Sequence, residues 1–241
     1  MPKPCLKDID VAVLAGGLGT RIHACLKDTP KIMAPVNGRP FLEYLLCWLE
    51  NYGARRVVMC LGHLGDRVGA WLENNPTSLE VVISQESDLL GTAGALRHAK
   101  NHLKSNPVMV MNGDSYVDTD LCALLAAHDK GGAGATLLCT EVDDARRFGH
   151  VSVGADGRIL SFEEKCLDVS GPGLINAGVY VLSSDFLDSL AVEKENSLEK
   201  DVFTSRPSGE LNAYVGRFPF IDIGTPESLD AASRILPILE S

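Results

Sequence analysis

The chain has 241 residues, 45% of them hydrophobic and 22% charged, which is the composition of a globular protein with one core. Its formal net charge of −10 argues against a nucleic-acid-binding surface, and no apolar run approaches the roughly 18 residues that span a bilayer. The seven cysteines include no C-x-x-C pair and the N-terminus lacks the apolar core of a signal peptide. We therefore expect one cytoplasmic domain with reduced cysteines and no nucleic-acid or membrane partner.

Strand and helix patterns alternate through the first 145 residues. Strands are predicted at 10–16, 55–62, 79–84, 107–114 and 134–140, and helices at 41–53, 66–73, 92–104 and 121–130. Pro40 opens the first helix, Gly53 ends it, and Thr92 is the expected N-cap of the third. This alternation predicts an α/β fold with a Rossmann-like, mixed but mainly parallel sheet flanked by helices. Ligands of such sheets bind beyond the carboxyl ends of the strands.

The pattern changes after residue 145. A hairpin is predicted at 150–165 with its turn at 155–157, followed by a strand at 174–182, helices near 185–190 and 198–203, and a short strand at 220–224. Thr225 and Pro226 begin a final helix that is expected to run to Leu239. We expect these residues to add a small mixed-sheet lobe to the first half.

A glycine-rich stretch, GGLGTR at 16–21, follows the first predicted strand, and Lys31 comes ten residues after Arg21. Glycines let backbone N–H groups approach a ligand, and the two cations offset the charge of phosphates. A P-loop, G-x-x-x-x-G-K-[ST], would need a lysine directly after its second glycine. A dinucleotide fingerprint, G-x-G-x-x-G, would need glycine where Ile22 stands. Neither pattern fits, and the glycines alone are also compatible with a tight strand-to-helix turn.

These motifs resemble those of the sugar-phosphate nucleotidyltransferases, which carry G-G-x-G-T-R, then P-K, then P-V. The matching stretches are 16–21, 30–31 and 35–36. The resemblance implies a nucleotide-diphospho-sugar transferase fold, with a nucleotide-binding half at about 1–145 and a sugar-phosphate-binding half at about 146–241. It implies nucleotide contacts from Leu14, Ala15, Gly16, Gly17, Gly19, Thr20, Arg21, Glu86, Gly91, Thr92 and Asn112.

Two aspartates end predicted strands, Asp114 in the sequence NGD and Asp222 in FIDIGT. Mg²⁺ is typically held by one or two carboxylates together with substrate phosphates, although Asn-Gly-Asp is also an ordinary turn sequence. The resemblance implies that both aspartates bind Mg²⁺ and that Arg21, Lys31 and Asp114 are catalytic. The reaction it implies is in-line attack of a sugar phosphate oxygen on the α-phosphorus of a nucleoside triphosphate, with release of pyrophosphate.

The resemblance places the turn at 90–94 beside the nucleobase, with Glu86 just upstream. A carboxylate accepts hydrogen bonds from the N1–H and amino group of guanine but would oppose the two carbonyls of uracil or thymine. Glu86 thus favours GTP, and a solvated loop carboxylate stays open as its alternative. The sugar 1-phosphate is expected to contact Gly149, Glu164, Lys165 and Asn176, with Lys165 on the phosphate.

Several longer stretches, among them LINAGVYVL, SLEKDVF and FIDIGTPE, look most like D-glycero-D-manno-heptose 1-phosphate guanylyltransferases. These enzymes make precursors of capsule and lipopolysaccharide. The expected substrates are therefore GTP and D-glycero-α-D-manno-heptose 1-phosphate. A mannose 1-phosphate guanylyltransferase, a UTP- or CTP-dependent relative and a non-catalytic nucleotide-sugar-binding module stay open, as does a homo-oligomer.

Overall fold

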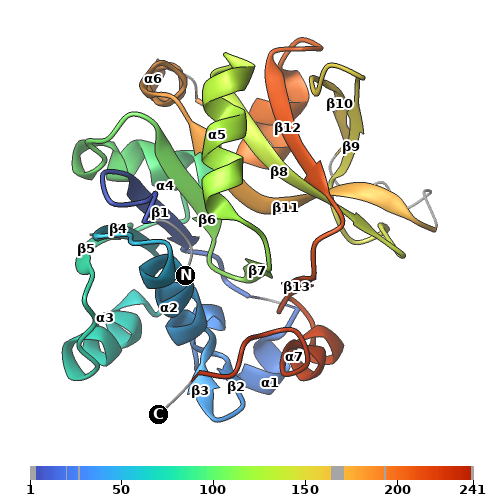
Figure 1. The fold of residues 1–241 in the computed structure, drawn as a ribbon. Helices are drawn as coiled ribbons and strands as arrows, with labels where there is room; N and C mark the ends of the chain where they lie inside the picture. Colours follow the sequence, from blue (N-terminus) through green and yellow to red (C-terminus); the bar gives the residue numbers. More distant parts are fainter. Residues whose placement is uncertain (1–3, 20, 27, 164–170, 193, 240–241) are drawn as a thin grey trace.

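The computed structural model describes residues 4–19, 21–26, 28–163, 171–192 and 194–239, apart from the side chains of 23 and 24. Most of its strands form one sheet in the order β10-β9-β11-β6-β1-β4-β5, with β8 between β11 and β12 (Figure 1). The strands of this sheet are β1 (Asp10–Ala15), β4 (Arg56–Leu61), β5 (Glu80–Gln85), β6 (Val108–Asn112), β8 (Ala135–Val142), β9 (His150–Val153), β10 (Ile159–Glu163), β11 (Gly173–Leu182) and β12 (Leu211–Gly216). Strands β6, β1, β4 and β5 are parallel, whereas β11 is antiparallel to β6 and β8. The predicted mixed α/β sheet is confirmed.

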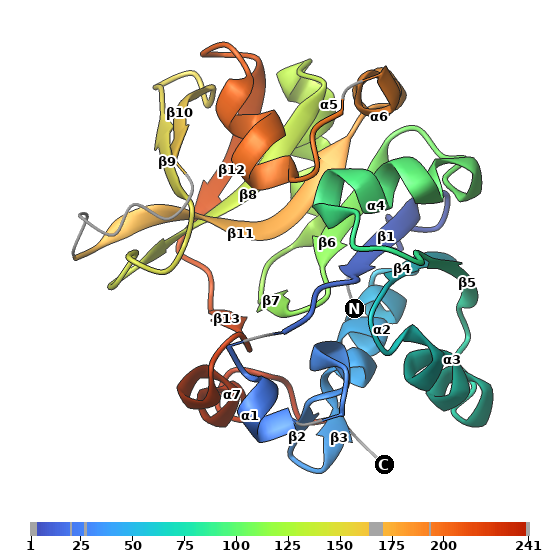
Figure 2. The same cartoon turned by 180° about the vertical axis from the view of Figure 1, so that it is seen from behind.

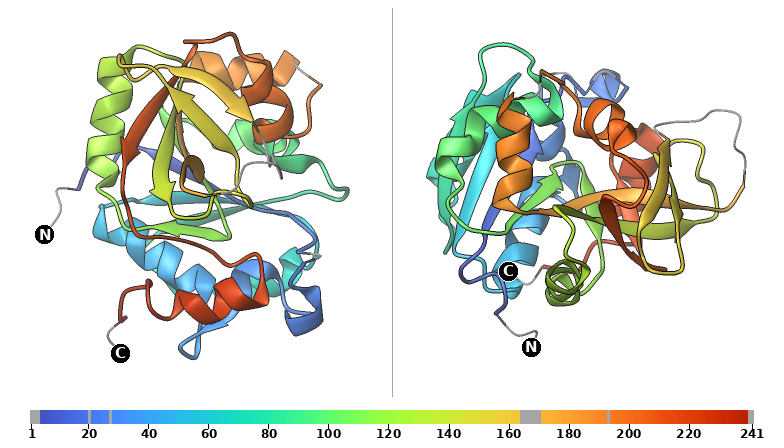
Figure 3. Two further views of the ribbon diagram at one scale, coloured as in Figure 1. Left: turned by 90° about the vertical axis from the view of Figure 1, so that its right-hand side faces the viewer. Right: turned by 90° about the horizontal axis from the view of Figure 1, so that it is seen from above.

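Helices lie on both faces of the parallel strands (Figure 3). They are α1 (His23–Leu26), α2 (Phe41–Asn51), α3 (Gly65–Asn74), α4 (Gly91–Ala99), α5 (Leu121–Gly131), α6 (Ser184–Val192) and α7 (Pro226–Ala232), with short turns η1 (Lys31–Met33) and η2 (Lys100–His102) and a π-helical segment η3 (Leu198–Phe203). Successive side chains of β1 point to opposite faces, so Val11 and Val13 join the core layer of α2 while Ala12 and Leu14 join that of α4. This two-sided burial explains why every residue between Asp10 and the glycine loop is apolar.

Two small sheets stand beside the large one. One pairs β2 (Pro35–Val36) with β3 (Arg39–Pro40), and the other pairs β7 (Ser115–Val117) with β13 (Phe220–Asp222). In the second sheet Asp222 lies opposite Ser115, the neighbour of Asp114. A pairing between residues about a hundred positions apart therefore brings the two aspartates to one place.

Strand β11 joins the two halves of the chain (Figure 2). Its end at Val179–Leu182 pairs with β6, both its beginning and its end pair with β8, and Ile175 pairs with His150 of β9. The register with β8 shifts between Asn176 and Tyr180, where Gly178 has a φ of 76° and a Cβ would lie 2.8 Å from Nδ2 of Asn112. The bulge thus needs glycine, because its φ is left-handed and a side chain there would meet Asn112.

Three local expectations were wrong. Leu90, not Thr92, is the N-cap residue of α4, because the Thr92 hydroxyl serves a tertiary contact instead. Helix α7 ends at Ala232 rather than Leu239. Cys5 and Cys122 form a disulfide across 117 residues of sequence, a pairing for which their spacing gives no signal. No helix in the described ranges is both long and apolar enough to cross a bilayer.

Candidate active site

Three adjoining cavities lie beyond the carboxyl ends of β1 and β6, and Asp114 lines all three. The first, here the loop cavity, has a volume of about 200 Å³ and is lined by Leu14, Ala15, Gly17, Gly19, Arg21, Lys31, Ile32, Gly113, Asp114 and Gly224. The second, the α4 cavity, is also about 200 Å³ and includes Gly16, Glu86, Gly91, Thr92 and Asn112. The third, the β11 cavity, is about 230 Å³ and includes Arg147, Gly149, Asn176, Glu199 and Asp222. The candidate residues that the structure describes therefore line one continuous region.

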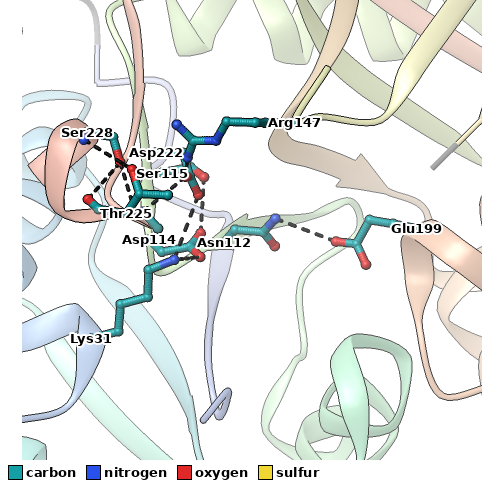
Figure 4. Close-up of polar contacts among 10 residues, drawn as sticks. Lys31, Asn112, Asp114, Ser115, Arg147, Glu199, Asp222, Thr225 and Ser228 are labelled. Carbon is teal, nitrogen blue, oxygen red and sulfur yellow. Dashed lines mark hydrogen bonds and ion pairs between the residues drawn. The ribbon is translucent and has the colours of Figure 1, made fainter. Parts of the chain in front are cut away.

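Lys31 and the two aspartates form the centre of this region (Figure 4). Lys31 Nζ lies 2.5 Å from Oδ2 of Asp114 and 3.8 Å from Oδ2 of Asp222. Pro30 holds an extended backbone (φ −57°, ψ 141°) just before η1, which presents the lysine from a stiff segment. The lysine is thus the cation shared by both carboxylates.

The two carboxyl groups have pKa values shifted in opposite directions. Burial alone would raise the pKa of Asp114, but the adjacent Lys31 ammonium and the Ser115 hydroxyl lower it below its ordinary value. Burial and then the negative charge of Asp114 raise the pKa of Asp222, against the pull of Lys31. The shifts differ in direction because Lys31 lies closer to Asp114 than to Asp222.

The carboxylates of Asp114 and Asp222 are the groups at this centre that could hold Mg²⁺. Nowhere in the described ranges do three or more histidine, cysteine, aspartate or glutamate side chains gather in a way that could hold a metal ion. Two carboxylates suit Mg²⁺, which takes its other ligands from water and substrate phosphates, better than they suit a metal held by protein alone. The shifted pKa of Asp222 agrees with a site completed by an added cation.

The glycine loop runs along the loop cavity and approaches β4 closely. A Cβ on Gly16 would lie 2.6 Å from Oε1 of Glu86, and a Cβ on Gly62 would lie 2.7 Å from the Gly16 carbonyl oxygen. Nothing lies within 4 Å of a Cβ on Gly17, which faces open space. The loop therefore exposes its backbone to the cavity as well as making a tight turn after β1. Thr20 lies outside the described residues.

Glu86 is buried at the rim of the α4 cavity, with 8% of its surface exposed. Its Oε2 atom is buried and has no hydrogen-bond partner among the described residues. Burial raises the pKa of this carboxyl above its ordinary value, and a backbone hydrogen bond from Leu90 opposes the shift. The alternative of a solvated loop carboxylate is therefore wrong.

Glu199 is a site residue that sequence reasoning missed. Its carboxylate accepts hydrogen bonds from the side chains of Thr92 (2.7 Å), Tyr180 (3.1 Å), Ser197 (3.2 Å) and Asn112 (3.5 Å). Oδ1 of Asn112 is buried without a partner in the described part of the chain, and Asn112 lines both the α4 and β11 cavities. Its sequence offered little signal, because Glu199 stands among the charged residues of SLEKDVF.

The structure describes two of the four residues that are expected to contact the sugar 1-phosphate. Gly149 and Asn176 both line the β11 cavity, where the Asn176 N–H donates to the Gly149 carbonyl at 2.9 Å. Glu164 and Lys165 lie outside the described residues. Arg147 was also missed, although it lines this cavity and donates to Asp222 at 3.0 Å. A run of two arginines before Phe148 was its only sequence signal.

Comparisons with known proteins agree with this arrangement. Residues 11–237 match the family model described as nucleotidyl transferase. The chain is 33% identical over 215 residues to the D-glycero-α-D-manno-heptose 1-phosphate guanylyltransferase of Campylobacter jejuni, covering 89% of this chain and 94% of the relative. It is 32% identical over 232 residues to the mannose-1-phosphate guanylyltransferase of Mycobacterium tuberculosis, covering 95% of this chain and 64% of the relative.

A solved structure shares the fold. The crystal structure of HddC from Yersinia pseudotuberculosis in complex with GMP-PN superposes with a TM-score of 0.82 at 31% identity, covering 94% of this chain and 98% of that one. Together, the family match, the relatives and the site show that the chain belongs to the nucleotidyl transferase family, in which it stands with the sugar 1-phosphate nucleotidyltransferases.

Proposed function

We propose that the protein transfers GMP from GTP to D-glycero-α-D-manno-heptose 1-phosphate, forming GDP-heptose and pyrophosphate. The observation that carries this proposal is the convergence of Lys31, Asp114 and Asp222 where the three cavities meet. Nucleotidyl transfer needs positioning and charge neutralisation more than an acid or base, and this centre offers both. The heptose guanylyltransferase relative and the structure bound to GMP-PN support the choice of substrates.

Each cavity takes one part of the reaction. The triphosphate lies in the loop cavity, against the backbone of the glycine loop and the cations of Arg21 and Lys31. The sugar 1-phosphate lies in the β11 cavity beside Gly149 and Asn176, with Glu164 and Lys165 completing its contacts. A phosphate oxygen attacks the α-phosphorus, the bond to the bridging oxygen of the β-phosphate breaks, and pyrophosphate leaves with that electron pair. Mg²⁺ on Asp114 and Asp222 would supply charge neutralisation at the phosphates.

Glu86 supports guanine as the base. Its Oε2 is a buried acceptor at the α4 cavity that no donor among the described residues reaches, and an unsatisfied buried acceptor is costly until a donor reaches it. Guanine offers two adjacent donors, N1–H and the amino group, whereas uracil and thymine offer one N–H between two carbonyls. Occupancy by guanine would therefore satisfy the carboxylate.

Mannose 1-phosphate is the second candidate substrate, because the mannose enzyme from Mycobacterium tuberculosis is 32% identical, close to the 33% of the heptose relative. Heptose carries one extra hydroxylated carbon, and pockets reject such additions poorly. The enzymatic test is pyrophosphate release with Mg²⁺ across four nucleoside triphosphates and the 1-phosphates of heptose, mannose, glucose and N-acetylglucosamine.

We expect the highest kcat/KM with GTP and the heptose phosphate, and a loss of base preference in Glu86→Gln. A higher kcat/KM with mannose 1-phosphate would show that mannose 1-phosphate, and not the heptose phosphate, is the sugar substrate. Turnover only with another triphosphate would show that the base is not guanine. If protein that melts cooperatively releases no pyrophosphate with any substrate pair, catalysis is contradicted and a nucleotide-sugar-binding module is favoured.

A further inference from the structure

Arg147 forms an ion pair at the centre of the site that the proposed reaction does not yet use. Its Nη2 lies 3.0 Å from Oδ1 of Asp222, and the arginine side chain is 40% exposed (Figure 4). The guanidinium also lies 5.5 Å from the ring centre of Phe148, which packs edge-on against Phe220 at 5.3 Å. The loop before β9 is therefore docked on β13, and the ion pair is part of that contact.

Asp222 is surrounded by donors and cations of the protein itself. Its Oδ1 accepts from Arg147 and from the Gly224 N–H at 3.0 Å, and its Oδ2 faces Lys31 at 3.8 Å. A divalent ion needs direct access to a carboxylate oxygen and repels a neighbouring guanidinium. Binding of Mg²⁺ to Asp222 and pairing of Arg147 with Asp222 therefore oppose each other.

Arg147 also lines the cavity that would receive the sugar phosphate. The β11 cavity is lined by three carboxylates, those of Asp114, Glu199 and Asp222, and by three cationic side chains, those of Arg21, Arg147 and Lys200. A dianionic phosphate cannot enter beside the carboxylates without nearby cations, and a guanidinium binds phosphate through two parallel hydrogen bonds. Because Arg147 is only partly buried, its side chain has room to turn from Asp222 into the cavity.

We propose that Arg147 is a substrate-binding cation that is held on Asp222 in the free protein. A divalent ion at Asp222 displaces it, and the released guanidinium binds the phosphate of the sugar 1-phosphate. The metal thereby makes the sugar site competent, which couples the two binding events. The second half of this inference rests on the proposed function, whereas the competition at Asp222 does not.

The chain offers a matched control in the adjacent arginine. Arg146 pairs with Asp144 at 2.5 Å, its side chain is 57% exposed, and it is absent from the lining of the three described cavities. Arg146→Ala removes the same charge from the same loop without touching Asp222. An effect on general electrostatics or loop folding would appear in both variants.

The first test is the affinity of the free protein for Mn²⁺, without nucleotide or sugar. The electron paramagnetic resonance signal of unbound Mn²⁺ measures this affinity. We expect Arg147→Ala to bind Mn²⁺ about fivefold more tightly than wild type, since one partly exposed charge-assisted competitor is lost. Arg146→Ala should match wild type, and Asp222→Asn should bind more weakly than either. Equal affinity of wild type and Arg147→Ala, including absence of binding by both, overturns the competition.

The second test is steady-state turnover with the best substrate pair. Arg147→Ala should raise the KM for the sugar phosphate about tenfold or more with a smaller change in kcat and in the KM for the nucleotide, and Arg147→Lys should restore part of the loss. An unchanged sugar KM overturns the phosphate contact. If no pair is turned over, the proposed function fails, while the Mn²⁺ titration still decides whether Arg147 competes for Asp222.

Discussion

Replacing Lys31 with alanine probes the charge balance of the site. The ammonium lies 2.5 Å from Asp114 and 3.8 Å from Asp222, so its loss leaves two neighbouring carboxylates short of positive charge. Removing one partner of a fully buried ion pair costs about 3–5 kcal/mol. Asp114 is 34% exposed and Arg147 still pairs with Asp222, so solvent and that pair reduce the expected cost. We take about 2 kcal/mol, a fall in Tm of about 4–8 °C for a chain of this size.

Mg²⁺ should reverse most of this loss in Lys31→Ala and stabilise wild type less, because the ion takes over the missing charge. Circular dichroism melts at pH 7, with and without Mg²⁺, measure both effects. Lys100→Ala is the control, since Lys100 forms only a surface pair with Asp188 at 2.7 Å. In the turnover assay kcat of Lys31→Ala should fall ~10²-fold or more, the effect of losing one preorganised charged contact. A variant that melts like wild type without Mg²⁺, or that keeps a near-normal kcat, refutes the reasoning.

The other predictions concern the base pocket, the bulge and the disulfide. The pKa of Glu86 is higher in the folded protein than the unfolded value of 4.5, so its contribution to the free energy of unfolding is full below pH 4.5 and is lost as pH rises through the folded pKa. Glu86→Gln lacks this titration. Its free energy of unfolding should therefore increase relative to wild type between pH 4.5 and pH 8, measured by paired urea titrations. Gly178→Ala should cost about 1–3 kcal/mol and weaken nucleotide binding by calorimetry, because the added Cβ meets the Asn112 side chain at a φ of 76°. Cys5→Ser should cost about 2–4 kcal/mol in thermal melts, as should reduction of wild type, whereas equal melting would contradict the pairing with Cys122.

The meeting of the glycine loop and Asp114 at one place was predictable because both follow strands. The parallel strands β1 and β6 end just before the glycine loop and two residues before Asp114, and parallel strands deliver their carboxyl ends to one edge of the sheet. Asp222 belongs to β13 and reaches Asp114 through the antiparallel pairing of β13 with β7. Thr92 shows the limit of local signals. Its position before an apolar helical run predicts an N-cap, yet its hydroxyl donates to Glu199 and accepts from the Leu198 N–H at 2.8 Å. A tertiary contact outweighed the local preference.

Glu199 and Arg147 could not be assigned from sequence because, apart from Ser197, the partners named here come from distant segments. The four donors to Glu199 lie on α4, at the end of β6, on β11 and just before η3. Arg147 meets Asp222 only because β13 pairs with β7. Through its single carboxylate, Glu199 accepts hydrogen bonds from Thr92, which lines the α4 cavity, and from Asn112, which lines both the α4 and β11 cavities. The side chains that connect the cavities therefore carry a local sequence that resembles an ordinary charged surface, and only the three-dimensional pairing of distant segments distinguishes them.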